Sequence, residues 1–214
     1  MVKFLNRQHA GQVLAELLLA YRVKKNIIVL ALPRGGVPVA YEVATKLKAP
    51  LDVFIVRKLG APTQPELAIG AIAQGDIIFL DENLIKQLGL TKSTIEAVIA
   101  KEKIELVRRE KIYRPDKSLL SLKNHTIILV DDGIATGATM YAALQALRLY
   151  LPQEIIVAIP VADQATCNKM LVLADQIICS YYPATLESVG QWYEDFNQTS
   201  DEEVLKFLKL ASQN

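Results

Sequence analysis

Two adjacent carboxylates, Asp131 and Asp132, follow an uninterrupted apolar run at residues 127–130. Two like charges side by side raise the free energy unless hydrogen-bond donors or a cation face them. The apolar run is typical of a strand buried on both faces, so the pair falls at the end of that strand. Ligands of open α/β sheets bind beyond the carboxyl ends of the strands, which makes the pair a candidate binding site.

Small residues and hydroxyls follow the acidic pair and lead into a predicted helix. A glycine there permits close backbone approach, and the first turn of the helix offers free N–H groups and a dipole that favour an anion. Because carboxylates accept hydrogen bonds from vicinal hydroxyls, the pair and the loop together describe a receptor for ribose 5-phosphate. The structural alternative is that Asp131 and Asp132 are solvent-exposed and a simple turn follows them. This alternative does not explain the small residues and hydroxyls of the loop. The loop residues are Ala135, Thr136, Gly137, Ala138 and Thr139.

Strand-like and helix-like segments alternate along the chain. This pattern predicts an α/β fold with a central, mainly parallel sheet and helices on both faces. We expect one domain over residues 1–214, with a core at about 26–180 and with the N-terminal helix and the tail at 181–214 as additions. The predicted strands are 27–32, 51–56, 126–131, 154–160 and 176–180, and the predicted helices are about 37–48, 91–113, 138–150 and 164–173.

Three further features lie outside this alternation. A hairpin is predicted at 69–80 around Gln74-Gly75-Asp76. Thr91 or Ser93 is expected to cap the long charged helix, and Thr199 or Ser200 a C-terminal amphipathic helix. The two cysteines read as core residues.

The bulk composition excludes several classes of function. A formal net charge of +1 gives no overall field for binding nucleic acid or an anionic membrane, so any phosphate binding must be local. The N-terminus predicts an amphipathic helix, not a signal peptide, and no run of about 18 apolar residues occurs. We therefore expect a soluble cytoplasmic protein that does not bind nucleic acid or membranes.

The stretch ILVDDGIATGATM, residues 128–140, resembles the phosphoribosyl pyrophosphate (PRPP) signature of the type I phosphoribosyltransferases. That signature has four apolar residues, two acidic residues and a small Thr-Gly-x-Thr loop. The variant most resembles the adenine and orotate style, since Ala135 stands where the hypoxanthine-guanine enzymes have Asp. The whole chain most resembles uncharacterised bacterial phosphoribosyltransferase-domain proteins.

The resemblance implies a role for each part of the signature. Asp131 and Asp132 would bind the ribose 2- and 3-hydroxyls, and residues 135–139 would hold the 5-phosphate. A pyrophosphate loop, often with a non-proline cis peptide, would be LPRGGVPVA with Arg34, Gly35 and Gly36. A mobile loop at 56–70 would bring basic side chains, Arg57 and Lys58, to PRPP.

The tail would then be the variable hood that holds the acceptor. Trp192, Tyr193 and Phe196 are the candidates for acceptor binding, although three such rings more commonly form a small packed cluster. Ala135 cannot act as an acid or base, and Glu66, Glu187 and Asp195 are carboxylates that could substitute.

The implied chemistry is displacement of pyrophosphate from PRPP by a nitrogen nucleophile, as in nucleobase salvage and nucleotide metabolism. Arg34, Arg57 and Lys58, together with the acidic pair, would act in catalysis. Mg²⁺ would be held mainly by the substrate, with Asp131 and Asp132 as its nearest protein groups and no dedicated protein ligands. The family also implies a homodimer.

Other readings of the same residues fare less well. No G-x-x-x-x-G-K-[ST] or G-x-G-x-x-G occurs, which excludes the nucleotide folds that need them. A receiver domain also has an acidic pair at a strand end, but too few residues follow Asp132 here. A PRPP or nucleotide sensor of the same fold remains the alternative to an enzyme, because a fold does not fix a function.

Overall fold

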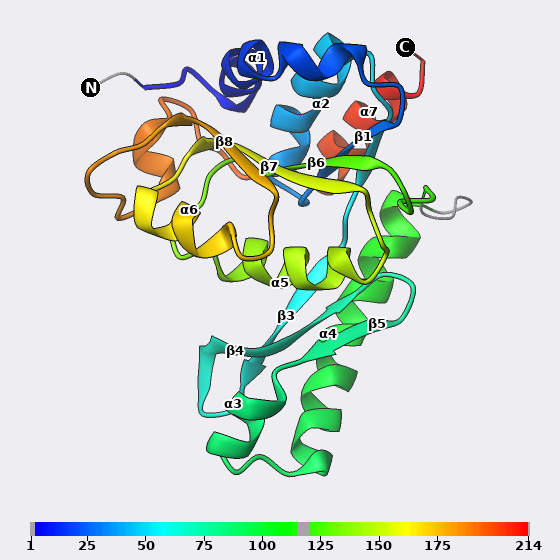
Figure 1. Cartoon of the computed structure of the whole chain (residues 1–214), viewed down its shortest axis with the longest axis vertical. Helices are drawn as coiled ribbons and strands as arrows, with labels where there is room; N and C mark the ends of the chain where they lie inside the picture. The colour runs from blue at the N-terminus through cyan, green and yellow to red at the C-terminus, as the bar shows by residue number, and fades with distance from the viewer. Residues whose placement is uncertain (1–2, 115–119, 214) are drawn as a thin grey trace. The chain divides into compact units, whose positions relative to one another are not determined.

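The apolar runs of the sequence form the strands of a parallel sheet in a computed structural model that describes residues 3–114 and 120–213 (Figure 1). The strand order is β2-β1-β6-β7-β8, and every neighbouring pair is parallel. All residues of β1 and β6 are buried, as expected for strands covered on both faces. The strands are β1 (Ile27–Ala31), β2 (Leu51–Val53), β6 (Thr126–Val130), β7 (Glu154–Val161) and β8 (Gln176–Tyr181).

Helices cover both faces of this sheet. The β1–α2–β2 and β7–α6–β8 connections run in opposite directions across it, so right-handed crossovers place α2 and α6 on opposite faces (Figure 1). The α1 helix lies on the α2 side, and α7 packs against α2. The predicted fold class is therefore confirmed. The helices are α1 (Arg7–Leu17), α2 (Gly36–Leu47), α6 (Gln164–Met170) and α7 (Asp201–Ala211), with 3-10 turns at Leu19–Val23 and Val189–Trp192.

The chain separates into two compact units, of which the parallel sheet and these helices form the first. The first unit spans Met1–Val53, Leu119–Thr136 and Leu151–Asn214, and the second spans Phe54–Ser118 and Gly137–Tyr150. The single domain expected from the sequence stays a prediction. Within the described residues, no helix combines the length and apolarity needed to cross a bilayer.

The second unit is built on an antiparallel sheet in the order β3-β4-β5. Its β4–β5 turn confirms the predicted hairpin, because Gly75 and Asp76 have φ values of 73° and 58°, as a tight hairpin turn requires. Helices α4 and α5 both pack against β3 and β4. The elements are β3 (Val56–Ala61), β4 (Gln64–Ala73), β5 (Ile77–Leu80), α3 (Glu82–Gln87), α4 (Lys92–Tyr113) and α5 (Ala138–Arg148).

One prediction for this unit is wrong. Residues 56–70, expected to form a loop, are β3 and the first part of β4, joined by a turn at residues 62 and 63. Arg57 and Lys58 therefore lie inside a paired strand, opposite Ile72 and Ala71. The prediction interpreted Gly60 as a loop residue. A Cβ at Gly60 would lie 2.4 Å from the Pro65 carbonyl oxygen, so this glycine permits strand pairing instead of loop flexibility.

Polar caps decide where the helices begin. The Thr91 hydroxyl accepts the Thr94 N–H at the start of α4, which selects Thr91 from the two predicted caps. Ser200 and Glu203 form a reciprocal capping box on α7, which selects Ser200 over Thr199. These local bonds satisfy backbone N–H groups that a helix end leaves unpaired.

Candidate functional site

The acidic pair lies at the carboxyl edge of the parallel sheet, beside the loop that follows β1. Strands β1 and β6 are neighbours, with Ala31 opposite Val130, so the chain segments leaving them start side by side. The Leu32 N–H donates to the Val130 carbonyl at 2.9 Å and extends the pairing beyond β1. The structure thus brings the predicted Arg34-Gly35-Gly36 turn to Asp131 and Asp132.

Two glycines make this approach possible. A Cβ on Gly35 would lie 2.1 Å from Oδ2 of Asp132, and a Cβ on Gly36 would lie 2.7 Å from the Val130 carbonyl oxygen. Both distances are too short for any side chain, so glycine is required for close approach and not for a left-handed turn. The Pro33–Arg34 peptide bond is cis, as the resemblance implied.

An arginine that the sequence did not single out holds one of the carboxylates. Arg7 lies at the start of α1, and its Nε donates to Oδ2 of Asp132 at 2.8 Å. The two side chains are 11% and 15% exposed, so the ion pair is largely screened from water. In the sequence Arg7 looks like an ordinary polar position of an amphipathic helix, and 125 residues separate it from its partner.

Burial and charge set the electrostatics of the pair. Burial raises the pKa of Asp131 well above its usual range, and the neighbouring Asp132 charge raises it further. Burial also raises the pKa of Asp132, while the Arg7 guanidinium opposes that rise. The Asp132 N–H donates to Oδ1 of Asp131 at 2.9 Å. Arg7 therefore favours the charged form of the carboxylate it contacts.

Arg34 extends from the turn toward the C-terminal helix. Its Nη1 lies 3.9 Å from Oδ1 of Asp201, the first residue of α7, and its side chain is 29% exposed. At this separation the pair is a weak ion pair, so the guanidinium can exchange partners at low cost.

The loop after the acidic pair divides between the two units. Ala135 and Thr136 belong to the first, and Gly137, Ala138 and Thr139 begin α5 in the second. Gly137 precedes the helix with φ 76°, a left-handed conformation that glycine adopts without strain. Thr136 and Thr139 are exposed, which leaves their hydroxyls accessible.

A pocket of about 310 Å³ in the second unit collects three of the predicted residues. Arg57 and Lys58 of β3 line it, with Thr139 at the start of α5. Lys101 and Glu102 come from α4, and Glu102 accepts two bonds from Arg57, 2.8 Å to Nε and 2.7 Å to Nη2. Among the side chains that the structure describes, the lining carries three cations and one carboxylate, a balance that favours an anion.

The tail aromatics pack as a cluster. Trp192 and Tyr193 are 5% and 3% exposed and pack with Phe4 from the N-terminal segment, and Phe196 is partly buried against them. The Arg7 guanidinium lies 3.9 Å above the ring of Phe196. No open ring face is therefore offered by Trp192 or Tyr193, and the predicted acceptor platform is not seen in this arrangement.

Tyr193 instead supports the acidic pair. Its hydroxyl donates to the backbone carbonyl of Asp132 at 2.5 Å, and burial raises the pKa of this phenol, which keeps it a proton donor. Of the alternative acids, Glu187 and Asp195 are exposed. The prediction for Glu66 falls on a side chain outside the described ones.

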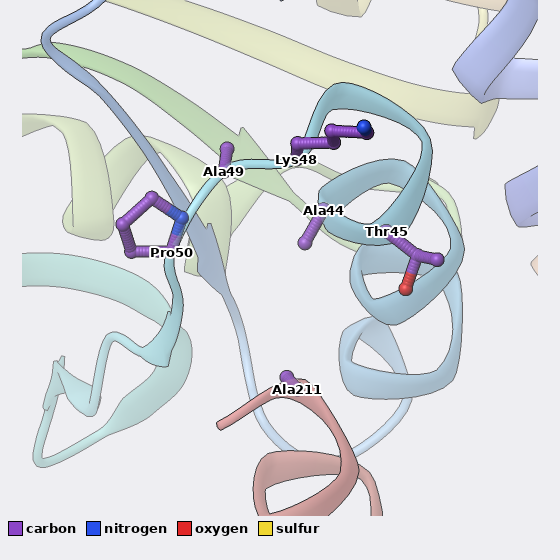
Figure 2. A pocket seen from close by; sticks show the side chains of 6 residues that line it. All are labelled: Ala44, Thr45, Lys48, Ala49, Pro50 and Ala211. Carbon is purple, nitrogen blue, oxygen red and sulfur yellow. The ribbon is translucent and has the colours of Figure 1, made fainter. Parts of the chain in front are cut away.

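A further cavity in the first unit is not lined by the predicted residues. Figure 2 shows this pocket of about 590 Å³ at the carboxyl end of α2, where Lys48 is the charged member of the lining. The Gly35–Gly36 turn is at the opposite end of this 12-residue helix, about 18 Å away. The lining residues are Ala44, Thr45, Lys48, Ala49, Pro50 and Ala211.

Comparison with known families agrees with this geometry. The model of the phosphoribosyl transferase domain matches residues 3–177, and the chain belongs to this family. The match includes α1 with Arg7, the glycine turn, the β3–β4 hairpin and the acidic pair.

Individual relatives support the assignment. A Mycobacterium tuberculosis protein, provisionally named a phosphoribosyl transferase, is 43% identical over 211 residues, which is 99% of this chain. The chain spans 47% of the length of that relative. The crystal structure of TT1426 from Thermus thermophilus superposes with a TM-score of 0.88 at 38% identity, covering 97% of this chain and 98% of that one. The AQ2163 protein from Aquifex aeolicus shares the fold, with a TM-score of 0.50 at 11% identity over 86% and 78% of the two chains.

Proposed function

We propose that the protein transfers the 5-phosphoribosyl group of PRPP to a nitrogen nucleophile, with a nucleobase as the acceptor, and releases pyrophosphate. One observation carries the proposal: a partly buried carboxylate pair lies against a glycine turn at the carboxyl edge of a parallel sheet. The membership in the phosphoribosyl transferase domain family supports it. The family resemblance further implies a cytoplasmic homodimer active in nucleotide metabolism.

In this proposal the acidic pair binds the sugar. Asp131 and Asp132 accept hydrogen bonds from the ribose 2- and 3-hydroxyls, which a carboxylate does well in a site shielded from water. The backbone of residues 135–139 and the hydroxyls of Thr136 and Thr139 hold the 5-phosphate, aided by the dipole of α5. The sugar is thereby fixed with its anomeric carbon free to react.

The bond that breaks joins the anomeric carbon to the pyrophosphate oxygen, and the bond that forms joins that carbon to the acceptor nitrogen. Positive charge develops on the ribose ring and negative charge on the departing pyrophosphate. The family resemblance implies that Arg34, Arg57 and Lys58 stabilise this negative charge. The turn at Gly35 and Gly36 allows the pyrophosphate to approach the backbone.

Mg²⁺ fits the donor set of the acidic pair, because each carboxylate keeps an oxygen of the kind that this ion prefers. When bound, the ion neutralises charge on the pyrophosphate. We propose that substrate oxygens and water supply most of its ligands, with Asp131 and Asp132 as the nearest protein groups.

The residue at position 135 limits which acceptor the proposed site can use. Ala135 cannot exchange a proton, so an acceptor that needs a carboxylate at this position, such as a 6-oxopurine, is disfavoured.

Calorimetric titration with PRPP and Mg²⁺, followed by phosphorus NMR with a pool of purine and pyrimidine bases, tests the proposal. We expect saturable PRPP binding and base-dependent release of pyrophosphate, and the base consumed identifies the acceptor. Binding without release, for every base, would show a PRPP sensor instead of an enzyme. Absence of PRPP binding would refute the proposed function.

A further inference from the structure

Each carboxylate of the acidic pair has one oxygen already engaged by the protein. Oδ1 of Asp131 accepts the Asp132 N–H, and Oδ2 of Asp132 accepts Arg7 Nε. Among the residues that the structure describes, no hydrogen bond reaches Oδ2 of Asp131 or Oδ1 of Asp132. One oxygen of each carboxylate is thus left for a ligand.

The engaged oxygens are those that face the glycine turn. Oδ2 of Asp132 lies 2.1 Å from the position of a Cβ on Gly35, and Oδ1 of Asp131 lies 3.2 Å from that on Gly36. Because the turn blocks this side of both carboxylates, a ligand can reach them from the other side. The orientation of each carboxylate therefore decides whether its second oxygen is presented.

Arg7 is itself fixed by three groups. Besides Asp132, its Nη1 donates to the Asn197 carbonyl at 2.6 Å, and its guanidinium stacks at 3.9 Å on Phe196. These partners come from the tail, whose backbone also pairs with the N-terminal segment through Phe4 and Trp192. A guanidinium held at this many points acts as a rigid donor and not as a mobile surface charge.

We propose that Arg7 is the positioning residue of the sugar site: it fixes the Asp132 carboxylate so that Oδ1 accepts one ribose hydroxyl beside Oδ2 of Asp131. This inference rests on the proposed function, because it assumes that the pair binds a vicinal diol. In this proposal the N-terminal helix and the tail together hold the Asp132 carboxylate in a fixed orientation beside that of Asp131.

The test compares Arg7→Gln and Arg7→Lys with the native protein by calorimetry, using PRPP, ribose 5-phosphate and pyrophosphate. We expect Arg7→Gln to weaken PRPP and ribose 5-phosphate about tenfold or more, because a charge-assisted hydrogen bond is lost, and to change pyrophosphate affinity less than about twofold. Arg7→Lys should recover the affinity for PRPP and ribose 5-phosphate only in part, since a single ammonium cannot reproduce the guanidinium contacts.

A matched control is Lys24→Gln, which removes the ion pair with Glu154 at the amino edge of the same sheet. Lys24→Gln should bind all three ligands as the native protein does. If Arg7→Gln proves too unstable to titrate, Arg7→Lys decides the question: a larger loss for ribose 5-phosphate than for pyrophosphate supports the inference, and equal losses contradict it.

Two results would overturn the inference while leaving the proposed function intact. One is that both Arg7 variants bind PRPP with the affinity of the native protein. The other is an equal loss for pyrophosphate and ribose 5-phosphate, which would show that Arg7 supports the fold and not the sugar site. Failure of the native protein to bind PRPP would instead reject the proposed function itself.

Discussion

The acidic site of the first unit and the basic pocket of the second hold their charges in different ways. Asp132 is 15% exposed and is held by Arg7 and Tyr193, which are 125 and 61 residues away in the chain. Arg57 is 32% exposed, and its partner Glu102 lies on a helix of the same unit. A buried carboxylate must be oriented before the ligand arrives, whereas an exposed cation can adjust to it. This difference agrees with our proposal that the acidic site recognises the sugar and the basic pocket neutralises charge.

The comparison predicts the largest effect for loss of both carboxylates. Asp131→Asn combined with Asp132→Asn should weaken PRPP by about a hundredfold or more, since two charge-assisted hydrogen bonds disappear. The fold should persist, because the pair lies beyond the end of β6 and not within the core. Calorimetry measures the affinity and circular dichroism checks the fold. Native PRPP affinity in a folded double variant would disprove the assignment of the sugar site.

A slightly smaller loss of PRPP affinity is expected when a methyl group is added at Gly35. Gly35→Ala places a Cβ 2.1 Å from Oδ2 of Asp132, so the carboxylate and Arg7 must move. We expect about a tenfold to hundredfold loss of PRPP affinity. Gly89→Ala is a useful control: it meets no atom within 4 Å but has φ 61°, so it should cost about 1 kcal/mol of stability without affecting the ligand. Equal PRPP affinities for the two variants would mean that the turn does not position the pair.

In the basic pocket, the two partners of the ion pair should have opposite effects. Arg57→Gln should slow cleavage of the bond to pyrophosphate about tenfold and weaken pyrophosphate binding, because a cation near the leaving group is removed. Glu102→Gln frees Arg57 from its carboxylate and should strengthen pyrophosphate binding. Pyrophosphate titration and turnover rates measure both. A matching loss in the two variants would indicate that Glu102 orients Arg57 instead of competing for it.

Prediction from sequence succeeded where the signal was local. The buried strands, the 74–76 hairpin turn and the caps at Thr91 and Ser200 follow from period, turn chemistry and capping within a few residues. The acidic pair was found for the same reason, because it follows a buried strand, whereas Gly35 and Gly36 were predicted from the family resemblance.

Prediction failed where the cause was long-range. Arg7 has no sequence signal, because its partners Asp132 and Asn197 become neighbours only when α1 and the tail pack together. Gly60 and the prolines around it suggested a loop, yet pairing with β4 overrode that local preference. The role of the tail rings was likewise decided by burial, which composition alone does not reveal.

A stability measurement sharpens the contrast between the two carboxylates. The pKa of Asp131 is raised on folding, so its contribution to stability is fully present below its unfolded pKa of about 3.9 and is lost as the pH rises through the higher folded value. Asp131→Asn removes this loss and should raise the thermal midpoint at pH 7, with the difference shrinking toward pH 4. Asp132→Asn should raise the midpoint less, because the pKa of Asp132 is also raised on folding but its replacement leaves Arg7 without a charged partner. A lower midpoint for Asp131→Asn at pH 7 would contradict this account.

The smallest effect is expected at an exposed ion pair of the second unit. Lys103 of α4 contacts Asp76 of the hairpin turn at 2.5 Å, but the side chains are 49% and 76% exposed. Water and salt screen such a pair, so Lys103→Gln should change the free energy of unfolding by less than about 1 kcal/mol and leave PRPP affinity unchanged. Urea unfolding at low and high salt measures the first quantity and calorimetry the second. A tenfold loss of PRPP affinity would mean that the cation set of the second unit extends beyond the pocket around Arg57, and that exposure alone does not separate structural charges from functional ones.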